Sequence, residues 1–134
     1  MARKVTSGAA LSIALGTQDE EGNWQQAGVY IETKNNTVAA SGDNEVVATP
    51  LTGQRIVVTS FVIQNESQTA TTMILRAGTS SNGWRYLAAA QGSYLSMVFA
   101  YGHEWRLPAN TPLNLNLSGA NQCGYSVSWY LENV

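Results

Sequence analysis

The chain has one cysteine and one histidine, the residue types from which a nucleophilic site is often built. Cys123 would need an activating base to act as a thiolate, and His103 is the obvious candidate for that base. The two residues stand alone and belong to no nucleophile motif. We therefore expect Cys123 to be a small buried hydrophobe in a strand, and a single cysteine allows no disulfide within the chain.

Acid–base, metal and phosphate chemistry have equally little support. Paired carboxylates would have to come from Glu66, Glu104 and Glu132, which we interpret as solvated surface charges. His103 and Glu104 are adjacent, but a metal needs three or four ligands and none stands at ligand spacing around them. The run after Gly78 has no lysine and no strand-to-helix junction, so it is not a phosphate loop. The sequence predicts a chain that is not an enzyme and holds no cofactor or metal.

Four tryptophans and six tyrosines are the remaining chemical resource. Trp24, Trp84, Trp105 and Tyr101 stand at the edges of expected strands, where aromatic rings fill a core, anchor a protein interface or bind sugar rings. Core packing or a subunit interface is the interpretation we favour, and sugar binding is the alternative.

A Trp-Arg dipeptide occurs twice, at Trp84-Arg85 and at Trp105-Arg106. Successive side chains of a strand point to opposite faces, so an inward tryptophan directs its arginine toward solvent or a partner. We therefore expect Arg85 and Arg106 to offer bidentate contacts to carboxylates of a neighbouring subunit.

The surface that surrounds these residues must be polar but uncharged. Only 12% of residues are charged, against the usual 25% or so, and Ser, Thr, Asn and Gln make up about a third of the chain. Such a surface loses water at lower cost than an ionic one, which favours subunit contacts. A net charge of −2 argues against nucleic acid. No stretch approaches the roughly 20 apolar residues of a membrane span, and no export signal is evident.

The elements that position these residues are short strands. From Gly53 onward, β-branched and aromatic runs alternate with turn residues, the pattern of a sandwich or barrel. Leu113, Leu115 and Leu117 alternate with polar residues, a period of two that places them on one face. Asn82-Gly83 indicates a tight turn. The expected strands are 55–63, 71–76, 84–90, 94–101, 104–107, 113–117 and 125–131.

The first 50 residues have a different character, because glycines interrupt short apolar runs and only 27–33 and 45–48 look like strands. So few large apolar residues cannot offset an ordering cost of roughly 1 to 2 kcal/mol per residue. We expect residues 1–42 to be an extended arm and loosely packed segment that orders on a neighbour, and residues 43–134 to be the sandwich domain. The candidate contacts in the arm are Arg3, Lys4, Leu11, Ile13, Leu15 and Trp24.

Three segments carry a resemblance to a known class of proteins: the run Gly53–Ser60, the glycine-rich turn at 78–83, and the run Leu113–Ala120 before the closing strand. Together they resemble the small β-sandwich virion structural proteins of tailed bacteriophages that decorate or cement capsids, over about 60% of the chain. The resemblance implies an all-β, antiparallel, jelly-roll-like sandwich, a homotrimer and no enzymatic activity.

Membership of that class would also define partners and location. The partners would be other copies of the chain and a major capsid protein or another virion protein, and the chain would reside in the virion after assembly in the host cytoplasm. The alternative is a carbohydrate-binding β-module, such as a phage fibre or tail tip, with a glycan as its ligand.

Overall fold

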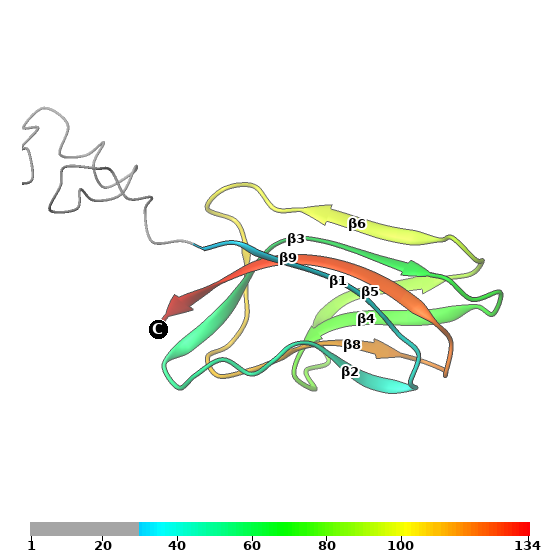
Figure 1. Cartoon of the computed structure of the whole chain (residues 1–134), viewed down its shortest axis with the longest axis horizontal. Helices are drawn as coiled ribbons and strands as arrows, with labels where there is room; N and C mark the ends of the chain where they lie inside the picture. The colour runs from blue at the N-terminus through cyan, green and yellow to red at the C-terminus, as the bar shows by residue number, and fades with distance from the viewer. Residues whose placement is uncertain (1–29) are drawn as a thin grey trace, which may run out of the picture. The chain divides into compact units, whose positions relative to one another are not determined.

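The computed structural model describes residues 30–134, and this part of the chain contains nine strands and no helix (Figure 1). The segments that separate the strands are turns rich in glycine, proline, asparagine or serine, as the sequence pattern indicates. The strands are β1 (Glu32–Val38), β2 (Gly42–Val47), β3 (Gln54–Asn65), β4 (Thr71–Ala77), β5 (Gly83–Ala88), β6 (Tyr94–Val98), β7 (Trp105–Arg106), β8 (Leu113–Leu117) and β9 (Cys123–Asn133).

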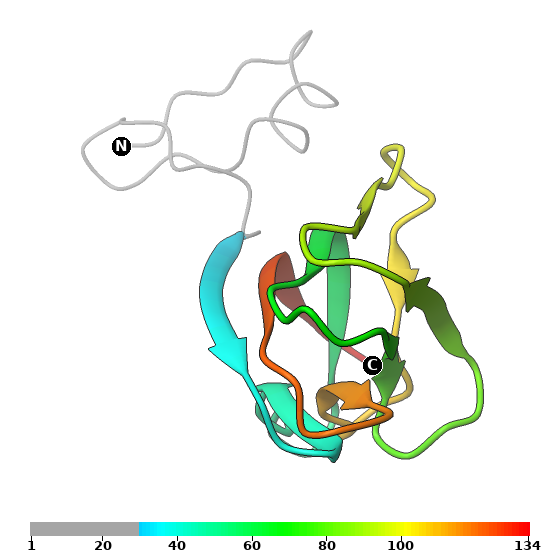
Figure 2. The same cartoon turned by 90° about the vertical axis from the view of Figure 1, so that its right-hand side faces the viewer.

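The strands form two antiparallel sheets that pack face to face (Figure 2). One sheet has the order β1-β9-β3-β6, with β7 also paired to β3, and the other has the order β2-β8-β4-β5. Within the described chain, β4 and β5 are the only consecutive strands that pair with each other. This strand order is that of a jelly roll. The expectation of an antiparallel, jelly-roll-like sandwich is confirmed, whereas most of the expected arm lies outside the described residues.

The core lies between the sheets and follows the period-two pattern of the sequence. Leu113, Leu115 and Leu117 are buried, as expected, and so are Tyr125 and Val127 on β9. Strand β3 alternates less strictly, because a register shift between Val58 and Ser60 inserts one extra residue into its pairing with β9. The other large side chains that are almost completely buried include Ile56, Val58, Phe61, Ile63, Met73, Leu75 and Leu107.

The sandwich begins earlier than residue 43, the boundary that the sequence pattern indicates. Strand β1 pairs with β9 along its whole length, from Glu32 opposite Trp129 to Val38 opposite Cys123. All its side chains except Val38 are exposed, so main-chain hydrogen bonds hold it on the sheet. A strand attached in this way has no hydrophobic alternation, which explains why sequence reasoning assigned residues 32–42 to the arm.

The expected tight turn at Asn82-Gly83 is also displaced. Gly83 is the first residue of β5 and pairs with Arg76, so the loop between β4 and β5 spans 78–82. A Cβ atom on Gly83 would lie too close to the carbonyl oxygen of Leu75, which explains the glycine at this position. The glycine therefore serves a close strand approach and not a two-residue turn.

Replacing Leu115 by alanine tests the core. Leu115 is fully buried, so Leu115→Ala is expected to lower the free energy of unfolding by about 2 to 5 kcal/mol. The matched control is Leu87→Ala on the outer face of β5, where the side chain is 63% exposed, and its effect should stay within about 0.5 kcal/mol. Urea unfolding followed by circular dichroism measures both, and equal losses would contradict this assignment of the core.

Candidate interaction surface

Cys123 and His103 do not form a nucleophilic pair. Cys123 pairs with Asn65 at the end of β3, whereas β7, two residues after His103, pairs with Val57 and Val58 near the start of β3. Seven residues of strand separate the two positions by about 20 Å. Cys123 is fully buried, and desolvation raises the pKa of its thiol to about 11. The expected packing role of Cys123 is confirmed.

The candidate carboxylates are held in hydrogen-bonded networks instead of being freely solvated. Glu132 accepts a hydrogen bond from Arg55 Nε at 2.6 Å and another from Arg106 Nε at 3.3 Å. The contact with Arg55 is the main reason that the pKa of Glu132 lies below its usual value. Glu66 lies near the opposite end of β3 and accepts a hydrogen bond from Gln122 at 2.6 Å. Glu104 and Glu132 share Arg106 as a partner, whereas Glu66 is bonded to Gln122.

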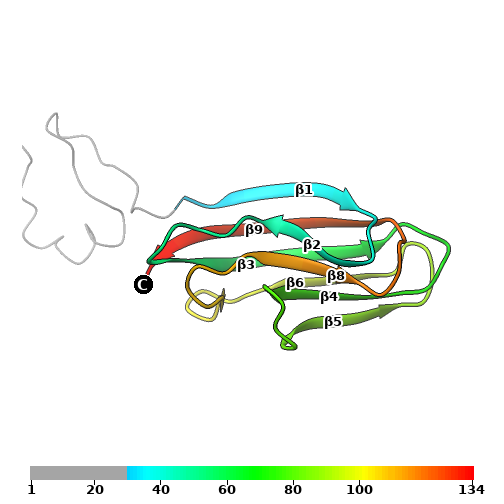
Figure 3. The ribbon, with the colours of Figure 1, turned by 90° about the horizontal axis from the view of Figure 1, so that it is seen from below.

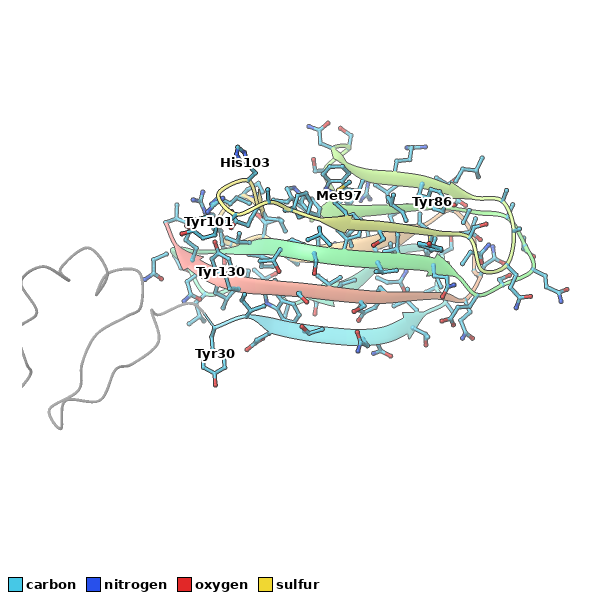
Figure 4. All side chains as sticks on the ribbon, turned by 90° about the horizontal axis from the view of Figure 1, so that it is seen from above. Tyr30, Tyr86, Met97, Tyr101, His103 and Tyr130 are labelled. Carbon is cyan, nitrogen blue, oxygen red and sulfur yellow. The ribbon has the colours of Figure 1, made fainter. Side chains whose placement is uncertain are left out.

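Metal chemistry likewise finds no site in the described chain. Residues 30–134 hold no group of three or more His, Cys, Asp or Glu side chains that could bind a metal ion. His103 lies in an exposed loop (Figure 4). Its neighbour Glu104 interacts with Arg106, at 3.4 Å.

In both Trp-Arg dipeptides the tryptophan is half-buried and the arginine is exposed, as the alternation of strand side chains requires. The two arginines differ in their ion pairs. Arg85 lies on the exposed face of β5 and makes no ion pair within residues 30–134. Arg106 contacts Glu132 and Glu104 of its own chain, so its carboxylate partners are already supplied. The other candidate interface residues lie outside the described residues: Arg3, Lys4, Leu11, Ile13, Leu15 and Trp24.

Trp84 is the centre of an aromatic cluster between the two sheets. Its ring centroid lies 6.0 Å from that of Phe61, 5.6 Å from that of Phe99 and 6.2 Å from that of Trp105. Trp84, Trp105 and Phe99 are half-buried and pack against the core. Because the two tryptophans meet other rings, they present no flat exposed platform of the kind that stacks on sugars.

The outer face of the five-stranded sheet has two halves of different chemistry. One half carries the ionic network of Arg55, Arg106, Glu104 and Glu132. The other half is uncharged up to its rim. Its residues come from β1, β9, β3 and β6, which lie side by side in Figure 4: Thr33, Asn35, Thr37, Ser126, Ser128, Ser60, Val62, Gln64, Tyr94, Ser96 and Val98.

An open hollow of about 410 Å³ lies on this uncharged half. Gly124 deepens it, because a Cβ atom there would collide with the Glu66 side chain that lies across β9. Among the described residues that line the hollow, Glu66 is the only charged one. The lining residues are Asn35, Asn36, Thr37, Val62, Gln64, Glu66, Gly124, Tyr125 and Ser126.

A second hollow, of about 550 Å³, lies beside β1 where the chain leaves β2. Its floor is apolar and includes Trp129, while Leu51 and Leu131 at its border are 76% and 46% exposed. Glu32 and Lys34 also line it. Two charged side chains therefore line this second hollow, whereas one charged side chain lines the first. Sequence reasoning missed both hollows, because each is formed by segments that lie far apart in the sequence.

No family model matches the chain, and no curated protein matches it. Among solved structures, a protein of the Bacillus endospore appendages, described as a novel family of disulfide-linked pili, is similar over 79% of this chain and 88% of its own, with 11% identity and a TM-score of 0.48. No helix in the described residues is long and apolar enough to cross a membrane.

The buried thiol gives a direct test of the packing role of Cys123. At pH 8 the native protein should not react with a thiol reagent, because the pKa of about 11 leaves almost no thiolate, and one thiol per chain should react after unfolding.

The same pKa shift makes the stability of the fold depend on pH. Because the pKa rises from 9.0 in the unfolded chain to about 11 in the native protein, the contribution of the neutral thiol to the free energy of unfolding is complete below pH 9 and is lost as the pH rises toward 11. Cys123→Ser should cost about 1 to 3 kcal/mol without affecting assembly. Rapid labelling of the native protein would contradict burial.

Proposed function

We propose that this chain is a non-enzymatic structural subunit that associates with itself, as a homotrimer, and decorates or cements a bacteriophage capsid. The observation that carries the proposal is the uncharged half of the outer face of the five-stranded sheet. Four strands contribute to it, and their outward side chains are hydroxyl, amide and small apolar groups. Such groups exchange water for a partner at low cost.

The arrangement of charge supports an interface and not a catalytic site. The described acidic groups near this face, Glu66, Glu104 and Glu132, already have hydrogen-bond partners within the chain. No buried side-chain nitrogen or oxygen in the described residues lacks a hydrogen-bond partner. The hollow on the uncharged half is open, and its described lining residues include a single charged one, Glu66, so they offer no group of charged side chains that would orient a small substrate.

The capsid is the setting that the sequence resemblance favours. Jelly-roll sandwiches occur among viral capsid and lectin domains, so the fold is compatible with this setting without specifying it. The proposed partners are a second and third copy of the chain and a capsid protein. The carbohydrate-binding alternative receives no support from Trp84 and Trp105, which are occupied by other aromatic rings.

Measuring the mass of the purified chain in solution tests self-association. Light scattering at micromolar concentration should give the mass of three chains, and a mass of 14.4 kDa, that of one chain, would contradict the proposal. Val62→Lys places a charge in the centre of the uncharged half, at a side chain that is 38% exposed. We expect it to raise the concentration for half-dissociation by about tenfold, since charge is disfavoured in an interface centre.

The control for Val62→Lys is Leu87→Lys, which adds the same charge to the outer face of the other sheet. Circular dichroism should show both variants folded. If the two variants weaken association equally, the uncharged half is not the interface. Binding of the wild-type chain to undecorated capsids, measured by co-sedimentation, tests the setting separately from self-association.

A further inference from the structure

The two open sides of the sandwich are closed differently. On the side formed by β1 and β2, the Lys34 amine reaches across the gap and donates a hydrogen bond to the Val46 carbonyl oxygen at 3.1 Å. Figure 3 shows β1 and β5 on opposite sides of the molecule. An inward lysine on an edge strand is a common protection against pairing with another chain. The side formed by β5 and β6 has no such closure among its described residues.

Apolar side chains are incompletely covered on the β5 and β6 side. Of the seven partly buried hydrophobic residues that pack against the core, five lie on β5, on β6 or immediately after β6. Figure 4 shows two of them, Tyr86 and Met97, in the band between the β5 and β6 ribbons. The five residues are Trp84, Tyr86, Leu95, Met97 and Phe99. The core therefore continues to the surface at this side.

Strand β6 is also the one edge strand of the described sandwich without a charged residue. The other edge strands carry Glu32 and Lys34 on β1, Asp43 and Glu45 on β2, Arg85 on β5, and Arg106 on the short β7. Strand β6 reads Tyr-Leu-Ser-Met-Val, and no charge or proline occurs between Gly92 and Gly102. An uncharged edge of high strand propensity is a template for a further strand.

The free edge of β6 offers a defined set of backbone groups. The N–H of Phe99 donates to the Thr59 carbonyl of β3 at 3.0 Å, and alternate residues of an antiparallel strand point the same way. Leu95 and Met97 therefore direct their backbone groups to β3. The N–H and C=O groups of Tyr94, Ser96 and Val98 consequently face away from the sheet, while the side chains of Leu95 and Met97 face the core.

We propose that residues 9–15 of a second copy of the chain add as a strand to the free edge of β6. This inference rests on the proposed self-association and adds a contact at the β6 edge to the proposed contact on the sheet face. The segment alternates large apolar residues with small uncharged ones, because Leu11, Ile13 and Leu15 are interleaved with Ser12 and Ala14. Pairing with β6 would place the three large residues against the uncovered apolar side chains and the small ones on the outer face.

The length of the segment allows a contact between copies. Residues 9–15 lie at least 15 residues before Ile31, where the sandwich unit begins, and an extended chain of that length reaches up to about 50 Å. The segment has no charge that would oppose burial, and its pattern of large and small residues matches the two faces of the β6 edge. A second copy of β6 would match the edge less well, since its Leu95 and Met97 already pack on its own core.

Two full-length variants each disrupt one partner of this contact, the segment 9–15 or the β6 edge. Leu11→Lys/Ile13→Lys charges the positions that face the gap, and its control Ser12→Lys/Ala14→Lys adds the same charge at the alternate positions. Ser96→Pro removes an N–H on the free edge and leaves the hydrogen bonds between β3 and β6 in place. Leu11→Lys/Ile13→Lys and Ser96→Pro should each raise the concentration for half-dissociation by more than about tenfold, whereas the control should change it less than about threefold.

Mixing the two defective chains gives the decisive result. Leu11→Lys/Ile13→Lys retains an intact β6 edge and Ser96→Pro retains an intact segment 9–15, so the mixture should recover one contact and show the mass of two chains. Light scattering measures the mass, and circular dichroism with urea unfolding shows that each variant is folded. Recovery in the mixture supports the inference.

Other outcomes overturn it. Loss of association in Ser96→Pro alone would indicate pairing of β6 with β6 of another copy. Association that neither variant weakens would place the interface elsewhere or dock the segment on its own chain, while the proposed function stands. A wild-type chain that stays monomeric at every concentration overturns both the proposed self-association and the inference that rests on it.

Discussion

The pairing of β3 with β9 is the interaction on which the rest of the structure depends. It joins the two longest strands along their whole length, from Gln54 opposite Asn133 to Asn65 opposite Cys123. Because side chains alternate on either side of the register shift between Val58 and Ser60, this pairing sets which side chains enter the core and which form the outer face. The strands β1, β6 and β7 attach to the free edges of this pair, so their positions follow from it. A shift by one residue would expose the core and bury the serines of β9.

The irregularity in this pairing, between Val58 and Ser60, divides the outer face into its two chemical halves. Before it, Val57 is buried on the outer side, where it pairs with Tyr130 on β9 and with Arg106 on β7. The ionic network around Arg106 surrounds this buried valine. Desolvation raises the pKa of the Tyr130 hydroxyl there above its usual value. Beyond the irregularity β6 replaces β7 as the neighbour of β3, and the face becomes uncharged.

Sequence reasoning predicted the parts of the fold that depend on burial. The alternation of Leu113, Leu115 and Leu117 gave β8 and its inward face, and the lone cysteine was placed correctly in the core. It could not predict β1, which is held by backbone hydrogen bonds and has almost no buried side chain. Nor could it pair Arg106 with Glu132, because the chain between them passes through β8 in the other sheet before β9 returns to the same sheet. A signal for the β6 edge did exist, in the uncharged run from Gly92 to Gly102.

The uneven protection of the edges has a physical consequence. A jelly roll leaves four edge strands, each with backbone groups that pair with water or with another chain. In the described sandwich β1, β2, β5 and the short β7 carry charged residues, whereas β6 carries none and lies beside an incompletely covered core. Exposed apolar surface and a free, uncharged edge at the same place cost stability in an isolated subunit, because burial of Leu95 and Met97 is incomplete there. A partner that covers both features recovers that stability. The chemistry of the edge also restricts the partner, since only a strand with large apolar residues at alternate positions satisfies the backbone groups and the gap together.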